Sequence, residues 1–203
     1  VSIDSKLIKK QEDRDLLQKW LAPHNEYFRL KLLYRGSRDG LNAEVFHKRC
    51  DNHPSTLTIV KSEFGKVFGG YSDQTWNYNV ARKASQKAWL FSIDEQQQYL
   101  IKPQMSAQAI FSLPLNGPIF GLGNDLRIEM MDSEPSSSTL GYTYQCSADC
   151  SEECNKLNQT ILAGAYQFTV EEIEIYSVET EKESGSNSSE FDSVLIDPEH
   201  DLN

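Results

Sequence analysis

Residues 57–71 read LTIVKSEFGKVFGGY, and this stretch decides the fold. Two runs rich in β-branched and aromatic residues flank residues 62–65 (SEFG), which predicts a β-hairpin with a glycine-containing loop. The second run carries Gly69 and Gly70, and a glycine pair inside a strand leaves room for another backbone or a large ring. Trp76 is the candidate to fill that room. We therefore expect this hairpin at the centre of a β-sandwich.

The composition limits the classes of partner. The chain has 203 residues, a formal net charge of −10 and a pI near 4.9, and no basic cluster is visible, so we expect no nucleic-acid partner. The sequence shows no signal segment and no apolar run near the length of a membrane span, so we expect no membrane insertion and a cytoplasmic location, where thiols stay reduced. The length suits one domain with extensions at both ends.

Alternating apolar residues predict further strands. Residues 28–34 (FRLKLLY) form a first strand, followed by a turn at residues 37–40 (SRDG). Shorter strands are predicted around residues 89–93, 99–101, 110–113 and 126–130. In the last strand, residues 165–178, the apolar face changes parity across Glu171 and Glu172, which predicts a β-bulge. The pattern is that of a mainly β fold with short helices (α+β), built as a two-sheet antiparallel β-sandwich.

Two segments have a helical pattern. Residues 3–21 carry an amphipathic stripe that ends before Pro23, so residues 1–23 are either a helix packed on the domain's own surface or the end of an upstream coiled coil that docks elsewhere. Asn42 can cap a short helix that carries Phe46 and Cys50 on one face. Cys50 is then a small core residue rather than a nucleophile.

Two polar segments break the strand rhythm. Residues 132–160 predict a variable surface insertion that contains Cys146, Cys150 and Cys154. Structural zinc sites usually take cysteines in two close pairs or together with paired histidines, so we favour reduced surface thiols over zinc. Residues 179–203 predict an acidic, largely disordered tail in which residues 191–196 (FDSVLI) are a candidate anchor for a partner.

No motif favours catalysis. Residues 117–123 (GPIFGLG) are glycine-rich, but a strand pattern follows them instead of a helix, so they predict a tight turn with close packing and no phosphate site. Four histidines are present, and no Gly-x-Ser-x-Gly motif accompanies them. We expect no enzymatic activity, no cofactor and no metal. A thiol-based redox protein that uses Cys50 or the cysteine triplet is the alternative, although the acidic neighbours of the triplet disfavour thiolates.

Several blocks, in this order, resemble the TLDc domain. They are residues 32–40 (LLYRGSRDG), Phe46-His47-x-x-Cys50, residues 65–71 (GKVFGGY) with Trp76, residues 89–93 (WLFSI), and residues 168–176 (FTVEEIEIY). The resemblance covers about residues 28–178, and the wording SRDG and FGGY is most similar to ciliate members. It implies a two-sheet β-sandwich, a role in resistance to oxidative stress and, for several members, binding to the V-type proton ATPase, whose assembly they regulate. It implies no catalytic residues.

We therefore expect a non-catalytic protein-interaction module. The V-type ATPase is the favoured partner, which would place the chain at the cytosolic face of a membrane complex. The alternative is a structural adaptor in a ciliary or cytoskeletal assembly that contains axonemal proteins. The candidate contact residues are Arg35, Arg38 and Asp39 in the first turn, and Phe64 at the hairpin tip. The sequence is equally compatible with Phe64 folding back onto the sandwich.

Overall fold

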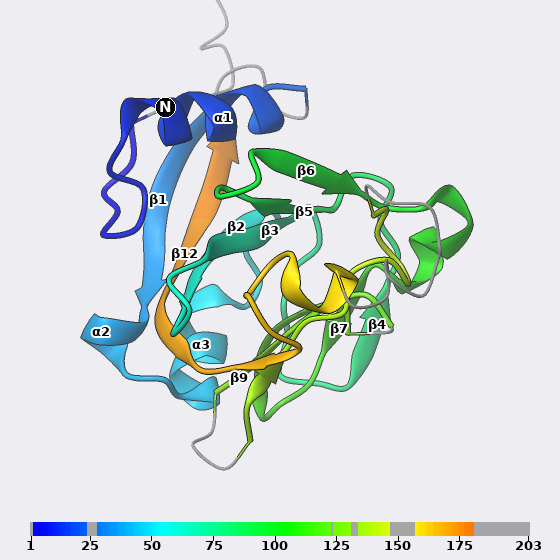
Figure 1. The fold of residues 1–203 in the computed structure, drawn as a ribbon. Coiled ribbons are helices and arrows are strands. Elements are labelled where there is room, and N and C mark those ends of the chain that lie inside the picture. Colours follow the sequence, from blue (N-terminus) through cyan, green and yellow to red (C-terminus); the bar gives the residue numbers. More distant parts are fainter. Residues whose placement is uncertain (1, 24–27, 123, 131–133, 147–156, 181–203) are drawn as a thin grey trace, which may run out of the picture.

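Two antiparallel sheets pack face to face in the computed structural model, which describes residues 2–23, 28–122, 124–130, 134–146 and 157–180 (Figure 1). Within these residues the first sheet has the strand order β1-β12-β2-β3-β5-β6, and the second has the order β11-β10-β9-β8-β7-β4. All neighbouring strands are antiparallel. The predicted two-sheet fold with a few short helices is confirmed.

The elements have the following bounds. The first sheet contains β1 (Phe28–Arg35), β2 (Thr56–Ser62), β3 (Val67–Ser72), β5 (Trp89–Ser92), β6 (Gln97–Leu100) and β12 (Val170–Thr180). The second contains β4 (Ala81–Lys83), β7 (Ile110–Ser112), β8 (Asn116–Phe120), β9 (Leu126–Glu129), β10 (Ser136–Ser137) and β11 (Gln167–Phe168). The helices are α1 (Gln11–Leu21), α2 (Gly36–Asp39), α3 (Ala43–Cys50) and the 3-10 helix η1 (Pro103–Gln108).

The hairpin that the sequence placed at the centre lies between β12 and β5. Strands β2 and β3 pair from Thr56↔Ser72 to Lys61↔Val67, with the predicted loop between them. A Cβ atom on Gly70 would lie 2.7 Å from Cζ of Phe120, a residue of the second sheet. The glycine therefore allows the two sheets to approach closely.

Trp76 does not fill the space beside the glycine pair, so that expectation was wrong. The rings closest to the two glycines belong to Phe91 and Phe120. Trp76 is fully buried in the core between the sheets, edge-on to Phe120 and Phe46, and its Nε1–H donates to Thr56 Oγ1 at 2.9 Å. A buried indole N–H is more stable with a hydrogen-bond acceptor, and a threonine in β2 supplies one here.

The N-terminal residues form a third layer on the outer face of the first sheet. Helix α1 crosses the end of the sheet near β1 and β12 (Figure 1), and Leu17, Trp20 and Leu21 contact an apolar cluster that includes Trp89 and Phe91. The helix begins at Gln11 and not near residue 3 as predicted. Residues 2–10 have no helical turn; instead Ser5 Oγ accepts hydrogen bonds from the N–H groups of Leu7 and Ile8. Such side-chain acceptors compete with the helix.

The predicted bulge in the last strand is confirmed. The register of β12 against β2 shifts between Val170 and Glu172, so Glu171 is the extra residue. Phe168 and Val170 before the shift, and Ile173 and Ile175 after it, all contact the core between the sheets. The bulge therefore reconciles two stretches of opposite parity.

The expectation of a surface insertion at residues 132–160 fails for residues 134–146. Ser136 and Ser137 form β10, which pairs with both β9 and β11 in the second sheet. Leu140 and Tyr144 are buried in the core between the sheets. Residues 147–156, with Cys150 and Cys154, and residues 181–203, with the candidate anchor, lie outside the described residues.

The glycine-rich residues 117–122 belong to β8 and the turn after it. Gly121 has a φ of +81°, and a Cβ atom there would lie 2.2 Å from Asp125 Oδ2. Asp125 is buried and accepts hydrogen bonds from the N–H groups of residues 141–144. Gly121 thus makes room for the Asp125 carboxylate, which holds residues 141–144. This agrees with the close packing predicted for the turn.

Candidate partner-contact surface

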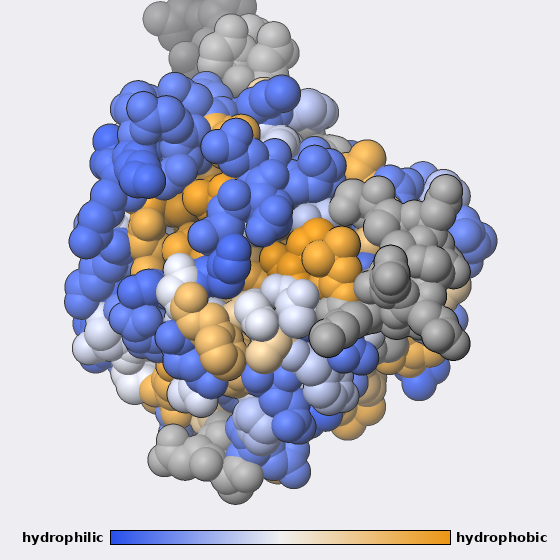
Figure 2. Space-filling model, viewed as in Figure 1, coloured by the Kyte–Doolittle hydropathy of each residue, from blue (hydrophilic) through white to orange (hydrophobic). Residues whose placement is uncertain are grey.

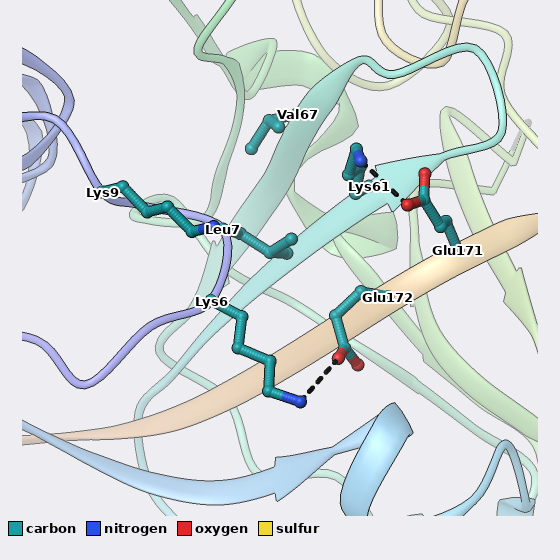
Figure 3. A pocket seen from close by; sticks show the side chains of 7 residues that line it. All are labelled: Lys6, Leu7, Lys9, Lys61, Val67, Glu171 and Glu172. Atoms are coloured by element: carbon teal, nitrogen blue, oxygen red, sulfur yellow. Dashed lines mark hydrogen bonds and ion pairs between the residues drawn. The ribbon is translucent and has the colours of Figure 1, made fainter.

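A groove lies where the N-terminal segment, the central hairpin and the bulge of β12 meet. Its volume is about 410 Å³, and it is lined by Lys6, Leu7, Lys9, Lys61, Val67, Glu171 and Glu172 (Figure 3). We call it the bulge groove. On the face shown in Figure 2, apolar surface is exposed between hydrophilic residues below α1. The groove combines apolar side chains with lysines and glutamates, which suits a polypeptide segment better than a small apolar ligand.

Two lysines of the bulge groove pair with its two glutamates. Lys61 Nζ lies 2.9 Å from Glu171 Oε1, and Lys6 Nζ lies 4.0 Å from Glu172 Oε2. Glu172 also accepts the N–H of Ser37 at 2.9 Å, so it connects the groove to α2. The first turn therefore does not line the groove and is connected to it only through Glu172, whereas the hairpin strands line it directly with Lys61 and Val67.

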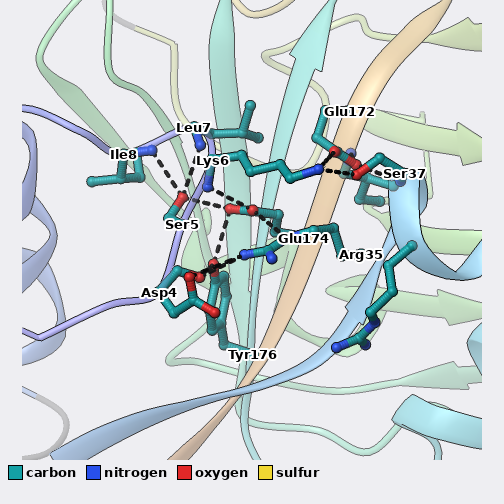
Figure 4. Close-up of polar contacts among 12 residues, drawn as sticks. Asp4, Ser5, Lys6, Leu7, Ile8, Arg35, Ser37, Glu172, Glu174 and Tyr176 are labelled. Carbon is teal, nitrogen blue, oxygen red and sulfur yellow. Dashed lines mark hydrogen bonds and ion pairs between the residues drawn. The ribbon is translucent and has the colours of Figure 1, made fainter.

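Arg35 points into a buried cluster and away from solvent. Its side chain is only 11% exposed, and its Nε lies 2.8 Å from Oε1 of the fully buried Glu174. Glu174 also accepts hydrogen bonds from Ser5 Oγ, from the N–H of Lys6 and from Tyr176 Oη (Figure 4). We call Ser5, Arg35, Glu174 and Tyr176 the N-terminal clamp, because they hold residues 4–6 against β12. As a partner contact, Arg35 is thus poorly placed.

The clamp changes the titration of its members. Burial raises the pKa of the Tyr176 hydroxyl well above its ordinary value, and the Glu174 carboxylate adds to the effect. Burial alone would lower the pKa of Arg35, but Glu174 outweighs it, so that the pKa of Arg35 is raised. Arg35 therefore stays charged, and Tyr176 stays a hydrogen-bond donor, over the physiological range.

Arg38 and Asp39 lie at the junction of α2 and α3. Asp39 is almost completely buried and accepts from both the N–H of Arg35 and the Arg38 guanidinium, with Arg38 Nη2 2.7 Å from Asp39 Oδ2. Arg49 from α3 contacts the same carboxylate at 3.1 Å. Asp39 thus organises two arginines and is not itself offered to a partner, whereas Arg38 is 43% exposed.

Phe64 lies at the hairpin tip with 52% of its surface exposed. A Cβ atom added to Gly164, which has a φ of +92°, would lie 2.9 Å from the Cβ of Phe64. One side of Phe64 therefore packs against the backbone at Gly164. Phe64 therefore packs against the loop on one side and is exposed on the other, and its role as a partner contact stays a prediction. It does not line the bulge groove.

His47, Cys50 and Cys146 each pack against or contact neighbouring residues in the part of the chain that the structure describes. Among the described residues, no group of three or more His, Cys, Asp or Glu side chains is arranged to hold a metal ion. Cys50 is buried, and burial raises the pKa of its thiol far above the ordinary value, so it is a core residue and not a thiolate. The His47 ring is held between Asp51 Oδ1 at 2.8 Å and the Leu113 carbonyl at 3.0 Å. Cys146 contacts Asn158 Oδ1.

Sequence reasoning missed Glu174, the centre of the clamp. A glutamate between Ile173 and Ile175 has the alternation of a half-exposed strand, and parity alone places it in solvent. The alternation does not reveal that residues 2–10 cover the face of β12 that carries Glu174. The only available signal was a tyrosine two residues along on the same side of the strand, a donor that a buried carboxylate can use.

The fold and groove together define a class: a two-sheet β-sandwich with an outer N-terminal layer and a mixed polar and apolar groove at a strand bulge. A family model described as the TLDc domain matches residues 2–179, and the chain therefore belongs to the TLDc domain family. The match includes the N-terminal segment that the clamp holds. No curated protein matches the chain. Across the described residues, every helix is too short or too polar to cross a membrane.

Proposed function

We propose that this chain is a non-catalytic protein-interaction module whose favoured partner is the V-type proton ATPase, and that it serves resistance to oxidative stress through the assembly of that pump. Membership in the TLDc family supports the class of partner and the process. The observation that carries the proposal is the bulge groove, because its open, charged and partly apolar lining fits a polypeptide segment.

The test is binding of the purified, membrane-detached V1 sector of the pump to the full chain immobilised on a sensor surface. The test variant is Lys61→Glu, which reverses a charge in the groove and leaves Glu171 without its partner at 2.9 Å. The matched control is Lys31→Glu, a lysine of β1 that lies 3.9 Å from Glu179 and does not line the groove.

We expect the unchanged chain and Lys31→Glu to bind V1 equally. Lys61→Glu should bind at least about tenfold more weakly, a loss of about 1.4 kcal/mol, because it reverses a charge in the groove. No binding of V1 by the unchanged chain refutes the pump as partner. Recovery of tubulin or axonemal proteins by the same immobilised chain would then support the adaptor in a ciliary or cytoskeletal assembly. A thiol-based redox function has less support, because the buried thiol of Cys50 is a poor nucleophile.

A further inference from the structure

Two arginines from different helices share one carboxylate at the junction of α2 and α3. Arg38 donates to Asp39 through Nε and Nη2, at 3.0 Å to Oδ1 and 2.7 Å to Oδ2, and Arg49 Nη2 lies 3.1 Å from Oδ1. Only 3% of the Asp39 side chain is exposed, against 43% of Arg38 and 46% of Arg49. We call these three residues the arginine corner. The carboxylate is hidden, whereas both arginine side chains are nearly half exposed.

The charge of the arginine corner is positive. Burial alone would raise the pKa of Asp39, but the hydrogen bonds from Arg38 and from the Arg35 N–H outweigh it, so the pKa lies below its ordinary value. Asp39 is therefore ionised at neutral pH, and it balances one of the two arginines. This local positive charge stands out on a chain whose formal net charge is −10.

Arg38 and the helix that carries it are held in place before any partner binds, and Arg49 is held through its ion pair with Asp39. Arg38 Nη2 also donates to the Leu33 carbonyl at 2.9 Å, and α2 is held to β12 by the hydrogen bond from the Ser37 N–H to Glu172. The start of α2 packs closely against β12, since a Cβ on Gly36 would lie 3.1 Å from Glu172 Oε1. A side chain that is already ordered loses little entropy on binding, so this corner can bind more tightly than a pair of free surface arginines.

We propose that the arginine corner binds a carboxylate side chain in an acidic segment of the protein partner. The proposal rests on the proposed function and names the chemistry of the partner. A guanidinium group carries five N–H donors and matches carboxylates well. The donors of Arg38 and Arg49 that are not directed at Asp39 or the Leu33 carbonyl are the ones that a second carboxylate would meet. Leu41, which is 39% exposed and lies against Gly36, gives the same segment an apolar contact, which a small free anion cannot use.

The test follows the Nε–Hε signals of Arg38, Arg49 and Arg29 by NMR in the full chain while an oligoglutamate peptide is added at low salt. Arg29 is the matched reference, because it is exposed and pairs with a single carboxylate, Glu179, at 3.4 Å. We expect saturable shifts at Arg38 and Arg49 that exceed those at Arg29. Arg49→Gln should weaken peptide binding about tenfold, or about 1.4 kcal/mol, and Arg29→Gln should change it less than about twofold.

Three results would overturn the proposal. Shifts at Arg29 as large as those at Arg38 and Arg49 would mean that the peptide binds arginines non-specifically through their charge. Inorganic phosphate that shifts the two signals as strongly and displaces the peptide would make this a small-anion site. The double variant Glu190→Gln, Asp192→Asn is measured without peptide. If its Arg38 and Arg49 signals differ from those of the unchanged chain, the chain's own acidic residues occupy the corner. The NMR titration contains no pump. A negative titration therefore does not refute binding to V1, and a lack of V1 binding does not refute peptide binding at the arginine corner.

Discussion

The substitution Glu174→Gln tests whether the N-terminal clamp holds the outer layer of the protein. Glu174 is fully buried, and its carboxylate accepts the Lys6 N–H at 2.8 Å, Arg35 Nε at 2.8 Å and Tyr176 Oη at 2.9 Å, as well as Ser5 Oγ. Glutamine keeps the size of the side chain, removes the negative charge, and turns one acceptor oxygen into a donor. Either the hydroxyls of Ser5 and Tyr176 at Oε2 or the N–H groups of Lys6 and Arg35 at Oε1 then face an NH2 group instead of an oxygen.

The magnitude follows from the charge left on Arg35. Breaking a buried ion pair by removing one partner typically costs about 3–5 kcal/mol. Arg35 is 11% exposed, and Asp4 lies 3.7 Å from its Nη2, which compensates in part, although Asp4 itself is 85% exposed. The glutamine oxygen also still accepts hydrogen bonds. We therefore expect the free energy of unfolding to fall by about 2–3 kcal/mol.

Urea unfolding followed by tryptophan fluorescence measures this change. Trp20 and Trp89 lie 6.3 Å apart, edge to face, at the interface between α1 and the first sheet, so their emission reports on that layer. Hydrogen exchange of the Lys6 amide gives a local readout, because this N–H loses its ionised acceptor. We expect its exchange in Glu174→Gln to become faster than that of amides in β2.

Glu171→Gln is the control. Glu171 is 52% exposed and pairs with Lys61 across the bulge groove, and such surface pairs contribute about 0–1 kcal/mol. If Glu174→Gln costs no more than Glu171→Gln, the clamp does not stabilise the outer layer and the apolar contacts of α1 alone hold it. Slow exchange of the Lys6 amide in Glu174→Gln would lead to the same conclusion.

Three further predictions concern the core and the helices. Asn42→Ala removes the acceptor that lies 3.1 Å from the Val45 N–H at the start of α3, and should cost about 1 kcal/mol in urea unfolding. Gly70→Ala puts a Cβ 2.7 Å from Phe120 and should cost about 1–3 kcal/mol in thermal unfolding; an unchanged midpoint would mean that the sheets can separate. Burial raises the pKa of Glu129 although Arg127 lowers it, so the folded state keeps this proton to higher pH than the unfolded state. Its contribution to stability therefore falls as the pH rises above 4.5, and Glu129→Gln should flatten that fall in urea midpoints measured across the pH series.

Strands could be predicted from the sequence because their pattern is local. The alternation in residues 89–93 requires only that successive side chains point to opposite faces, and Trp89 and Phe91 do share one buried face. The helix after Asn42 was equally local, since its cap and its buried face lie within nine residues. Predictions of this kind hold when the information lies within one element.

The features that the sequence did not predict depend on contacts between distant residues. The start of α1 is displaced because Glu174 and Tyr176 hold the backbone of residues 4–6. The strand at Ser136 and Ser137 is two polar residues long, and only its neighbours β9 and β11 make it recognisable. Arg35, predicted to be a partner contact in the first turn, points inward for the same reason: its acceptor lies 139 residues away.

The bulge at Glu171 joins these observations, because one extra residue assigns the glutamates of β12 to different surroundings. Before it, the even-numbered Phe168 and Val170 face the core between the sheets; after it, the odd-numbered Ile173 and Ile175 do. Glu174 is thereby turned to the outer face, where the N-terminal segment covers it, and Glu171 itself stays exposed beside Lys61. A strand without the extra residue would direct Glu174 toward the core, where an unpaired carboxylate is strongly unfavourable. The same irregularity therefore forms the floor of the groove and the anchor for the layer beside it.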